Sequence, residues 1–387
     1  MERIKKVTVV AAFALIIFGF ALCLLLAPEK TFSDSERRAL AAAPELRWST
    51  VKSGDYFEDA ETYLLDQFPL RDGFRSLKAV TNHSVLQRMD VDGYYSADGH
   101  LSQLTGELDP RQVQLAIDKF NQIIAEHPEL GSAYYAVIPD KNYFLAEANG
   151  YPVMDYEALF GQMESVTAEP IDLTDLLSLE DYYTTDSHWR QERILPVARR
   201  LCEAMGVTAG TDYTAHDLLG FSGVYAGHSA IPTQPETLTY LTSAATEAAL
   251  VQSYEQQTPM AVYNEADFAG VDPYDVYLSG AEALITIENP LVDNDRHLIL
   301  FRDSFGSSLA PLLLDSYGKI TLVDLRYVSS ALLDGLVDFT DADVLFLYST
   351  TLLNSGSILK YGSSPGGCGL PGTSVLGRKN LLACRDD

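Results

Sequence analysis

Apolar and polar positions in the second half of the chain follow two rhythms, one typical of strands and one typical of helices. Short apolar runs at 298–301, 320–323 and 344–348 predict buried strands, and the segments between them place apolar residues at helical spacing. A further strand is predicted at 133–138, after an amphipathic helix. Short apolar strands that alternate with helices predict an α/β fold in which a mainly parallel sheet is covered on both faces.

The first hydrophobic run, from Val7 to Ala27, is uncharged and long enough to span a bilayer. Arg3, Lys5 and Lys6 precede it, which places the amino terminus in the cytoplasm and the rest of the chain outside. The alternative is a cleaved signal peptide, whose apolar region is usually shorter and ends at a small-x-small site. We therefore expect an uncleaved anchor, and the leucines around Cys23 argue against a lipoprotein.

The same pattern divides the chain into segments of different character. In chain order we expect a cytoplasmic N-terminus (1–6), a transmembrane anchor (7–27), a polar linker (28–55), one α/β domain (56–353) and a loose Gly/Ser-rich tail (354–387). Within the domain, residues 207–292 are rich in Thr, Ala, Gly and Tyr and show no regular rhythm. We interpret them as an insertion or lid-like region of mixed structure.

Charge and cysteine content narrow the classes of function. Lys and Arg number 27 and Asp and Glu number 54, so the formal net charge is -27. A chain with this charge repels phosphate backbones, which argues against nucleic acid as a partner. The four cysteines show no metal-ligand spacing and are too few for a disulfide scaffold. We predict neither a metal site nor a cofactor, and pairing of Cys368 with Cys384 in an exported chain stays open.

The polar residues after the strand at 298–301 carry the first candidate chemistry. Ser304 falls in a turn marked by Gly306, at the carboxyl end of the strand, where open α/β sheets bind their ligands. A hydroxyl in this place could act as a nucleophile, with backbone N–H groups of the following helix as part of an oxyanion hole. The alternative is structural, with Asp303 or Ser304 as the N-cap of that helix.

A second candidate pair lies upstream, in a polar loop before a helix that Gly206 ends. Asp186 and His188 are two residues apart, and in an extended segment such residues point to the same side. A nucleophilic serine needs a base to take its proton, and the base needs an acid that fixes its tautomer. The pair could supply both. In the structural alternative, Asp186 or Ser187 caps the helix and His188 lies on the surface.

Together the two segments resemble a known family. "TTDSHW" and "LILFRDSFGSSLAPLL" are similar to segments of the DHHW family, which is related to the alginate O-acetyltransferases with their SGNH-hydrolase-like domain. Further blocks of the resemblance are "SERRALAAAPEL", "YLLDQFPLRDGF", "GYYSADGHL", "VIPDKNYF", "FSGVY", "DPYDVYLSGA" and "KITLVDLRYV". The resemblance implies an SGNH-hydrolase-like three-layer α/β/α fold, which would follow the single N-terminal transmembrane helix.

Carried over residue by residue, the resemblance implies Ser304 as the nucleophile, His188 as the base and Asp186 as the acid that orients it. The Asp/His pair precedes the serine, as in those acetyltransferases. The chain departs from the family's name motif, because Ser187 stands where a histidine is usual. A second candidate base is therefore missing, but the D-x-H-W pattern and the implied triad are retained.

Other residues are candidates for the oxyanion hole. The backbone N–H of Ser304 is one expected donor. Asn142, near a strand end, and Gly223, in a loop, are candidates for the second donor, and the sequence does not choose between them.

Three further residues are candidates for substrate contacts. Lys141 and Arg326 follow strands and could bind an anionic group at the mouth of the site, or could form solvated ion pairs. Trp189 could contact a sugar, although packing against the helix start is its commoner role.

The resemblance and the apolar run together imply a membrane-anchored, extracytoplasmic enzyme that acts on acyl esters. We expect an O-acetyltransferase that modifies a cell-surface polysaccharide through an acetyl-serine intermediate. A membrane-bound O-acyltransferase that supplies acetyl groups is the expected protein partner. The alternatives are a carbohydrate esterase with the same triad, since transfer and hydrolysis differ in water exclusion, and a non-catalytic glycan-binding or assembly protein.

Overall fold

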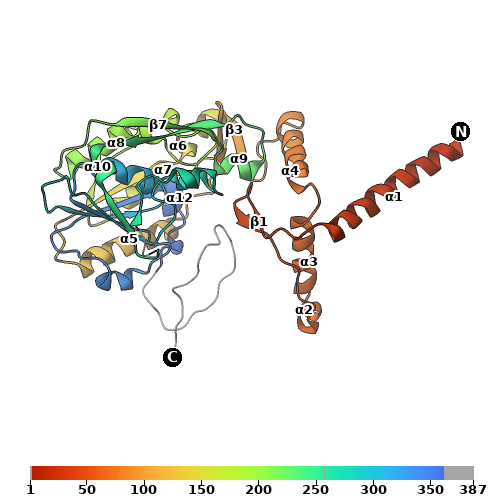
Figure 1. Ribbon diagram of the computed structural model, residues 1–387, viewed down its shortest axis with the longest axis horizontal. Coiled ribbons are helices and arrows are strands. Elements are labelled where there is room, and N and C mark those ends of the chain that lie inside the picture. Colours follow the sequence, from red (N-terminus) through yellow and green to blue (C-terminus); the bar gives the residue numbers. More distant parts are fainter. Residues whose placement is uncertain (1, 257–258, 361–387) are drawn as a thin grey trace. The chain divides into compact units, whose positions relative to one another are not determined.

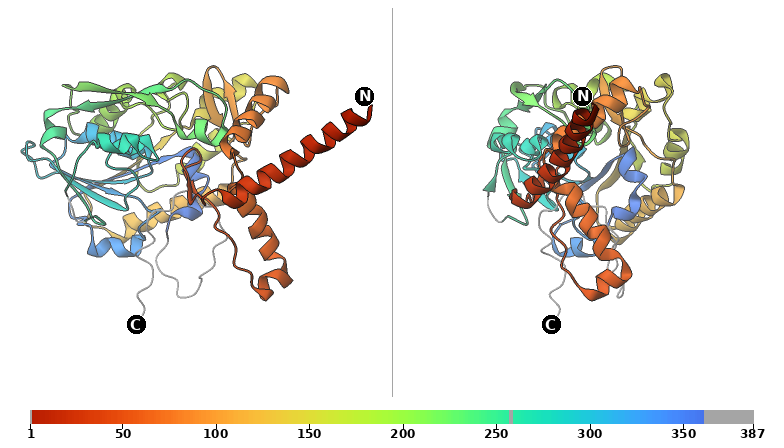
Figure 2. Two further views of the ribbon diagram at one scale, coloured as in Figure 1. Left: turned by 45° about the vertical axis from the view of Figure 1, so that its right-hand side comes forward. Right: turned by 90° about the vertical axis from the view of Figure 1, so that its right-hand side faces the viewer.

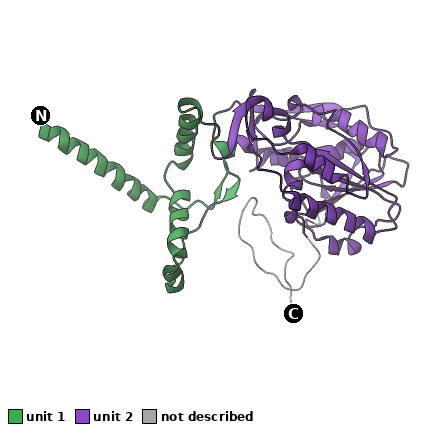
Figure 3. Cartoon of the chain, turned by 180° about the vertical axis from the view of Figure 1, so that it is seen from behind, with its two compact units in different colours: residues 1–91, 227–232, 370–387 green, residues 92–226, 233–369 purple. Residues whose placement is uncertain are grey.

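The computed structural model describes residues 2–256 and 259–360 (Figure 1). The tail from residue 361 onward, with Cys368 and Cys384, lies outside these residues. The chain forms two compact units: unit 1 holds residues 2–91 and 227–232, and unit 2 holds residues 92–226 and 233–360 (Figure 3). The predicted domain start at residue 56 therefore falls inside unit 1.

Unit 1 begins with one long apolar helix, α1 (Glu2–Leu26), which has no buried residue and in which a stretch of 18 residues has a mean hydropathy of 3.0 (Figure 2). Its length and composition are sufficient to cross a membrane, as predicted, although a signal sequence would pass the same test. The remaining elements are β1 (Phe32–Ser33), β2 (Arg38–Ala39), α2 (Trp48–Ser53), α3 (Asp55–Asp66), α4 (Arg71–Val80) and the π-helical turn η1 (Thr81–Val85).

Unit 2 is built on an eight-stranded sheet with the strand order β10-β9-β11-β13-β12-β14-β5-β6. Strands β13, β12, β14, β5 and β6 pair in parallel, and β11, β9 and β10 continue the sheet in antiparallel pairs. This confirms the predicted α/β fold with a mainly parallel sheet. The strands are β5 (Ser132–Ile138), β6 (Glu169–Pro170), β9 (Leu250–Ser253), β10 (Pro259–Met260), β11 (Leu284–Glu288), β12 (His297–Arg302), β13 (Lys319–Val323) and β14 (Asp343–Ser349).

Helices and two small sheets complete this unit (Figure 1). The α-helices are α5 (Pro110–Glu126), α6 (Lys141–Leu145), α7 (Tyr156–Met163), α8 (Leu195–Ala204), α10 (Ala244–Ala248), α11 (Phe305–Leu309) and α12 (Thr350–Leu353), and α9 (Val224–Ser229) runs from unit 2 into unit 1. The 3-10 turns are η2 (Glu147–Asn149), η3 (Leu179–Asp181), η4 (Gln191–Arg193), η5 (Glu265–Ala269), η6 (Pro273–Val276), η7 (Ala310–Leu313), η8 (Ser330–Gly335) and η9 (Gly356–Ile358). The small antiparallel sheets are β3 (Tyr94–Ala97) with β4 (His100–Gln103), and β7 (Thr214–Phe221) with β8 (Glu236–Thr242).

Alternate residues of the central strand face two separate hydrophobic cores. Leu298 and Leu300 of β12 pack in a core shared with α8 and α11, whereas Ile299 and Phe301 pack in a core shared with α5 and α7. Successive side chains of a strand point to opposite faces of its sheet, so helices cover both faces. The predicted three-layer α/β/α arrangement is therefore confirmed.

Three sequence-based expectations about elements need correction. Residues 250–288, within the region expected as an insertion or lid-like region, carry β9, β10 and β11 and so belong to the main sheet. Polar residues stand beside the apolar ones in β9 and β11, and β10 has only two residues, which hid these strands from the pattern that marked the parallel strands. The segment between the strands predicted at 320–323 and 344–348, expected to be helical from residue 328 to residue 337, forms only the 3-10 turn η8 there. Residues 354–360, expected as the start of a loose tail, include η9 and the buried Leu359, which packs with the α5 core.

Candidate active site

The turn after β12 is held by Asp303. Its carboxylate accepts the backbone N–H of Phe305 at 3.0 Å and that of Ser349 at 2.9 Å, which ties the turn to the end of β14. Ser304 is the N-cap residue of α11 by position, but its side chain makes no capping hydrogen bond. The Asp303 carboxylate thus caps the start of α11, and the Ser304 hydroxyl has a different partner.

The second segment, from Tyr182 to Trp189, is a tight loop closed by an isolated β-bridge between these two residues. Asp186 is 1% exposed, and its Oδ1 accepts the backbone N–H of His188 at 3.0 Å. Its Oδ2 accepts the backbone N–H of Val224 at 2.7 Å. Asp186 therefore does not cap the helix that follows it. It is fixed inside its own loop, with its side chain beside that of His188.

Ser304, His188 and Asp186 form one chain of hydrogen bonds. The Nδ1 of His188 lies 2.6 Å from Oδ1 of Asp186, and its Nε2 lies 2.7 Å from Oγ of Ser304. An ionised carboxylate can only accept, so Nδ1 carries the imidazole proton and Nε2 is left to accept the serine hydroxyl proton. A serine nucleophile needs this arrangement for activation by a general base.

Tyr274, which the sequence did not single out, covers the imidazole. Its ring stacks on His188 with centroids 3.9 Å apart and planes 8° apart. Its hydroxyl lies 2.7 Å from Oγ of Ser308, which also accepts the indole N–H of Trp189 at 2.9 Å. Burial raises the pKa of Tyr274 well above its usual value, so the phenol stays a neutral donor. The only signal in the sequence was its place in "DPYDVYLSGA", and nothing local there shows that it meets a histidine.

Lys141 lies under the loop and not at the mouth of the site. It is 2% exposed, and its Nζ is 2.9 Å from the carbonyl of Tyr183, 3.2 Å from that of Thr184 and 3.0 Å from that of Asp186. The carbonyl of Leu101 is a fourth acceptor. A protonated amine has three N–H donors, so these carbonyls occupy all of them. The predicted anion-binding role is therefore wrong, and burial lowers the pKa of Lys141 to about 7.

Glu236, at the start of β8, holds the N–H groups of the same loop. Its carboxylate accepts the backbone N–H of Thr184 at 2.6 Å and that of Thr185 at 2.7 Å, together with the Thr185 hydroxyl at 2.5 Å. Lys141 thus binds the carbonyls and Glu236 binds the amides of one short segment. Two buried or half-buried charges fix the backbone that presents Asp186.

The expected oxyanion donors differ in their availability. Within the described part of the chain, the backbone N–H of Ser304 donates to no other group. The N–H of Gly223 donates to the Thr185 hydroxyl at 2.9 Å, so it supports the loop instead. The amide nitrogen of Asn142 donates to the Thr105 hydroxyl at 2.7 Å, and its oxygen accepts from Tyr95. The Ser304 N–H is therefore available to an oxyanion. Gly223 and Asn142 instead make hydrogen bonds that support the structure around the site.

The two remaining substrate-contact candidates also have structural partners. Arg326 donates from Nε and Nη2 to the two oxygens of Asp324, at 2.9 and 2.6 Å, so the ion-pair alternative describes it. Trp189 is fully buried and packs edge-on against Phe305, which excludes contact with a sugar. Its size made it a plausible platform, but its indole lies beneath the site.

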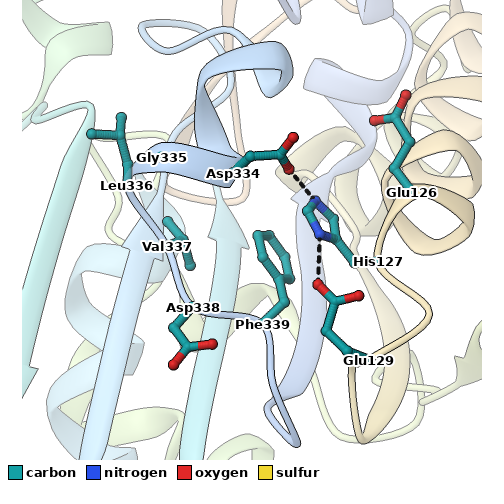
Figure 4. Close-up of a pocket in the computed structure, with 9 residues that line it drawn as sticks. All are labelled: Glu126, His127, Glu129, Asp334, Gly335, Leu336, Val337, Asp338 and Phe339. Carbon is teal, nitrogen blue, oxygen red and sulfur yellow. Dashed lines mark hydrogen bonds and ion pairs between the residues drawn. The ribbon is translucent and has the colours of Figure 1, made fainter.

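A cleft of about 650 Å³ lies near the amino-terminal ends of β5 and β14 and contains none of the predicted site residues (Figure 4). His127 stacks on Phe339, with ring centroids 3.6 Å apart. Its Nδ1 lies 3.1 Å from Glu129, and its Nε2 lies 3.5 Å from Asp334. Ser304 follows β12, so it is at the opposite, carboxyl-terminal edge of the parallel strands. The cleft is therefore not part of the hydrogen-bonded site.

Comparison with known proteins rests on solved structures, because no protein-family model and no curated protein matches the chain. A DHHW family protein from Eubacterium siraeum has a TM-score of 0.59 and 20% identity, over 70% of this chain and 96% of its own. The chain has the DHHW fold. PatB1 from Bacillus cereus, in a structure with a sulfonyl adduct, has a TM-score of 0.55 and 18% identity, over 70% of this chain and 98% of its own.

In this example of the DHHW fold, the position after Asp186 is occupied by Ser187. The Ser187 hydroxyl lies 3.5 Å from Oδ1 of Asp186 and 3.5 Å from Nδ1 of His188, which are long contacts. The 2.6 Å bond between the acid and the imidazole is thus formed without a second histidine.

Proposed function

We propose that this protein is a membrane-anchored serine acyltransferase that moves acetyl groups onto hydroxyl groups of a cell-surface polysaccharide. The observation that supports it most strongly is the hydrogen-bonded chain in which His188 lies 2.7 Å from Ser304 and 2.6 Å from Asp186. The DHHW fold supports the acyltransferase part of the proposal, and the apolar helix α1 supports the membrane anchor. A membrane-bound O-acyltransferase that supplies the acetyl group remains part of the proposal.

The geometry supports a two-step reaction. In the first step, Oγ of Ser304 attacks the carbonyl carbon of an acetyl ester while Nε2 of His188 takes the hydroxyl proton. Asp186 stabilises the imidazolium, and the Ser304 N–H donates to the oxyanion. The C–O bond to the leaving group then breaks, and the imidazolium returns its proton to the leaving oxygen. The product of this half-reaction is an acetyl-serine.

In the second step, a sugar hydroxyl takes the place of the leaving alcohol. His188 removes its proton, and the sugar oxygen attacks the acetyl carbonyl, which releases Ser304 and returns the proton to it through the imidazole. Water at the same position would give an esterase. Transfer and hydrolysis use the same residues and differ in whether water is excluded from the acetyl-serine.

The proposal is tested by acetyl release from p-nitrophenyl acetate with and without an oligosaccharide acceptor. Ser304→Ala should abolish turnover, and His188→Ala should reduce it by about 100- to 10,000-fold, the usual value of general-base help. His216→Ala is a matched control, because His216 bonds the Thr242 hydroxyl on the β7–β8 sheet. Mass spectrometry of the acceptor distinguishes transfer from hydrolysis. A folded protein that neither releases nor transfers acetyl groups would favour the binding-protein alternative.

A further inference from the structure

Helix α4 turns Arg71 and Arg75 inward and several apolar side chains outward, where its other charged residues, Asp72 and Lys78, are also exposed. Ala79 is buried, and Arg75, on the same side, donates to the carbonyls of Gly227 and His228, which also belong to unit 1. The apolar side chains on the opposite side stand at helical spacing. Their exposed fractions are 75%, 44% and 61% for Leu70, Phe74 and Leu77.

Helix α3 has a charged residue at its only buried position, and its other acidic residues are exposed beside its apolar side chains: Asp55, Glu58, Asp59 and Glu61. Its buried residue is Asp66, which accepts from Nη1 of Arg38 at 2.9 Å and from the backbone N–H of Ala41 at 2.9 Å. The hydrogen bond from Arg38 holds the pKa of Asp66 below its usual value. The exposed apolar residues of this helix and the turn after it follow helical spacing: Phe57, Leu64, Leu65 and Phe68. We call these side chains, with those of Leu70, Phe74 and Leu77, the outward apolar face.

Exposure of the outward apolar face to water is unfavourable. A helix on the surface of a soluble protein turns its apolar stripe inward and its charges outward. Here the guanidinium of Arg71 pairs with Glu36, and that of Arg38 pairs with Asp66. These charged groups therefore bind one another within unit 1. Contiguous exposed apolar surface marks contact with a membrane or another protein.

The outward apolar face also contacts the helix that is long enough to span a membrane. The ring of Phe20, on α1, stacks with Phe68 at a centroid distance of 5.3 Å and meets Phe74 edge-on at 5.8 Å. Phe20 lies in the apolar part of α1, six residues before the helix ends at Leu26. A side chain that touches Phe20 while α1 is embedded is therefore at or below the level of the lipid headgroups.

We propose that the outward apolar face of α3 and α4 lies in the bilayer, in the leaflet beside the Leu26 end of α1. These two helices then lie along the membrane plane, as interfacial amphipathic helices do. Trp48, which begins α2 and is 81% exposed, suits the same interfacial position. The segment between the anchor and the enzyme unit is thus a membrane-seated platform and not a free linker.

The recognition is apolar and does not depend on anionic headgroups. The arginines of these helices are engaged in pairs inside unit 1, and the net charge of -27 opposes attraction to anionic lipid. Zwitterionic phosphatidylcholine should therefore be sufficient.

The test is quenching of tryptophan fluorescence by brominated phosphatidylcholine in vesicles that contain the full chain at a high lipid-to-protein ratio. In a Trp48→Phe background only the buried Trp189 remains, because the chain has two tryptophans. Phe74→Trp and Leu77→Trp report the outward apolar face, and Ser76→Trp reports an exposed polar position of the same helix. We expect bromines on the acyl chains to quench positions 74 and 77 several-fold more than position 76.

Position 77 makes no ring contact with Phe20, so it keeps the test valid if Phe74→Trp disturbs that stack. Replacement of part of the phosphatidylcholine by phosphatidylglycerol should leave the difference unchanged. Equal quenching at all three positions would overturn the proposal. Weak quenching at 74 and 77 would overturn it as well, because a partner protein or a second copy would then cover this face and exclude lipid.

Discussion

The substitution Lys141→Met tests whether the backbone of the Asp186 loop is held by a buried amine. Lys141 donates to the carbonyls of Tyr183, Thr184 and Asp186, so its hydrogen bonds to this loop are all to the backbone. Methionine has a similar volume and keeps the apolar stem, but it has no N–H. The change therefore removes hydrogen bonds without opening a large cavity.

The magnitude follows from the carbonyls that lose a donor. The carbonyl of Thr184 keeps the N–H of Leu101 at 2.8 Å, whereas the carbonyls of Leu101, Tyr183 and Asp186 lose the Lys141 amine. Each buried acceptor left unsatisfied costs about 1–3 kcal/mol, so three would cost about 3–9 kcal/mol. Removal of an amine whose burial is unfavourable offsets part of this, and we expect a net loss of about 2 kcal/mol. A loop that shifts by about 1 Å to find water would cost about 100-fold in turnover.

Urea melts and turnover of p-nitrophenyl acetate measure the two effects together. The matched control is Lys119→Met, because Lys119 is also buried and donates to Ser330 at 3.2 Å, away from the loop. Lys119→Met should lower stability and leave turnover close to that of the wild type. If Lys141→Met keeps full turnover, or if both variants lose it equally, the loop-positioning role is refuted.

Four further predictions follow from the same contacts. Since burial lowers the pKa of Lys141 to about 7 and the unfolded chain holds a lysine near about 10.4, the unfolded state binds more protons in between. Wild type should thus gain stability relative to Lys141→Met as the pH rises from 7 to 10 in paired urea melts. Gly223→Ala should reduce turnover without preventing folding, because a methyl group there would lie 2.5 Å from the Cα of Asp186; unchanged turnover would contradict this close packing. Asp186→Asn should fold normally but lose orders of magnitude in turnover through the wrong imidazole tautomer, and a near-normal rate would exclude the triad. Protease added to intact cells should digest unit 2, and full protection in cells but not in lysates would reject its extracytoplasmic side.

Local sequence signals were sufficient for the parts of the site that depend on neighbours in the chain. A strand that ends in Asp303 and Ser304 and turns at Gly306 predicts where the hydroxyl lies. An acid two residues from a histidine predicts that their side chains meet, although the structure achieves this through a closed loop and not an extended strand. The parallel strands were predictable because both of their faces are buried, which requires continuous apolar runs.

Features that depend on distant parts of the chain could not be read locally. The position of Lys141 after a strand suggested the mouth of the site, but its partners lie about 40 residues away along the chain and enclose it. Tyr274 meets His188 only because η6 folds over the loop. Strands β9 and β11 each pair antiparallel with two neighbouring strands, and it is this pairing with distant parts of the chain, and not their own sequence pattern, that places them in the sheet.

The proposed nucleophile is tested most directly by modification of the whole protein with a small sulfonyl fluoride, followed by intact mass and peptide mapping. A serine polarised by an imidazole should attack the sulfur and displace fluoride, whereas an ordinary surface serine should not. The account predicts one adduct, located on Ser304, that is absent from Ser304→Ala and forms orders of magnitude more slowly in His188→Ala. An unmodified Ser304 in folded protein, or equal labelling of wild type and Ser304→Ala, would contradict it.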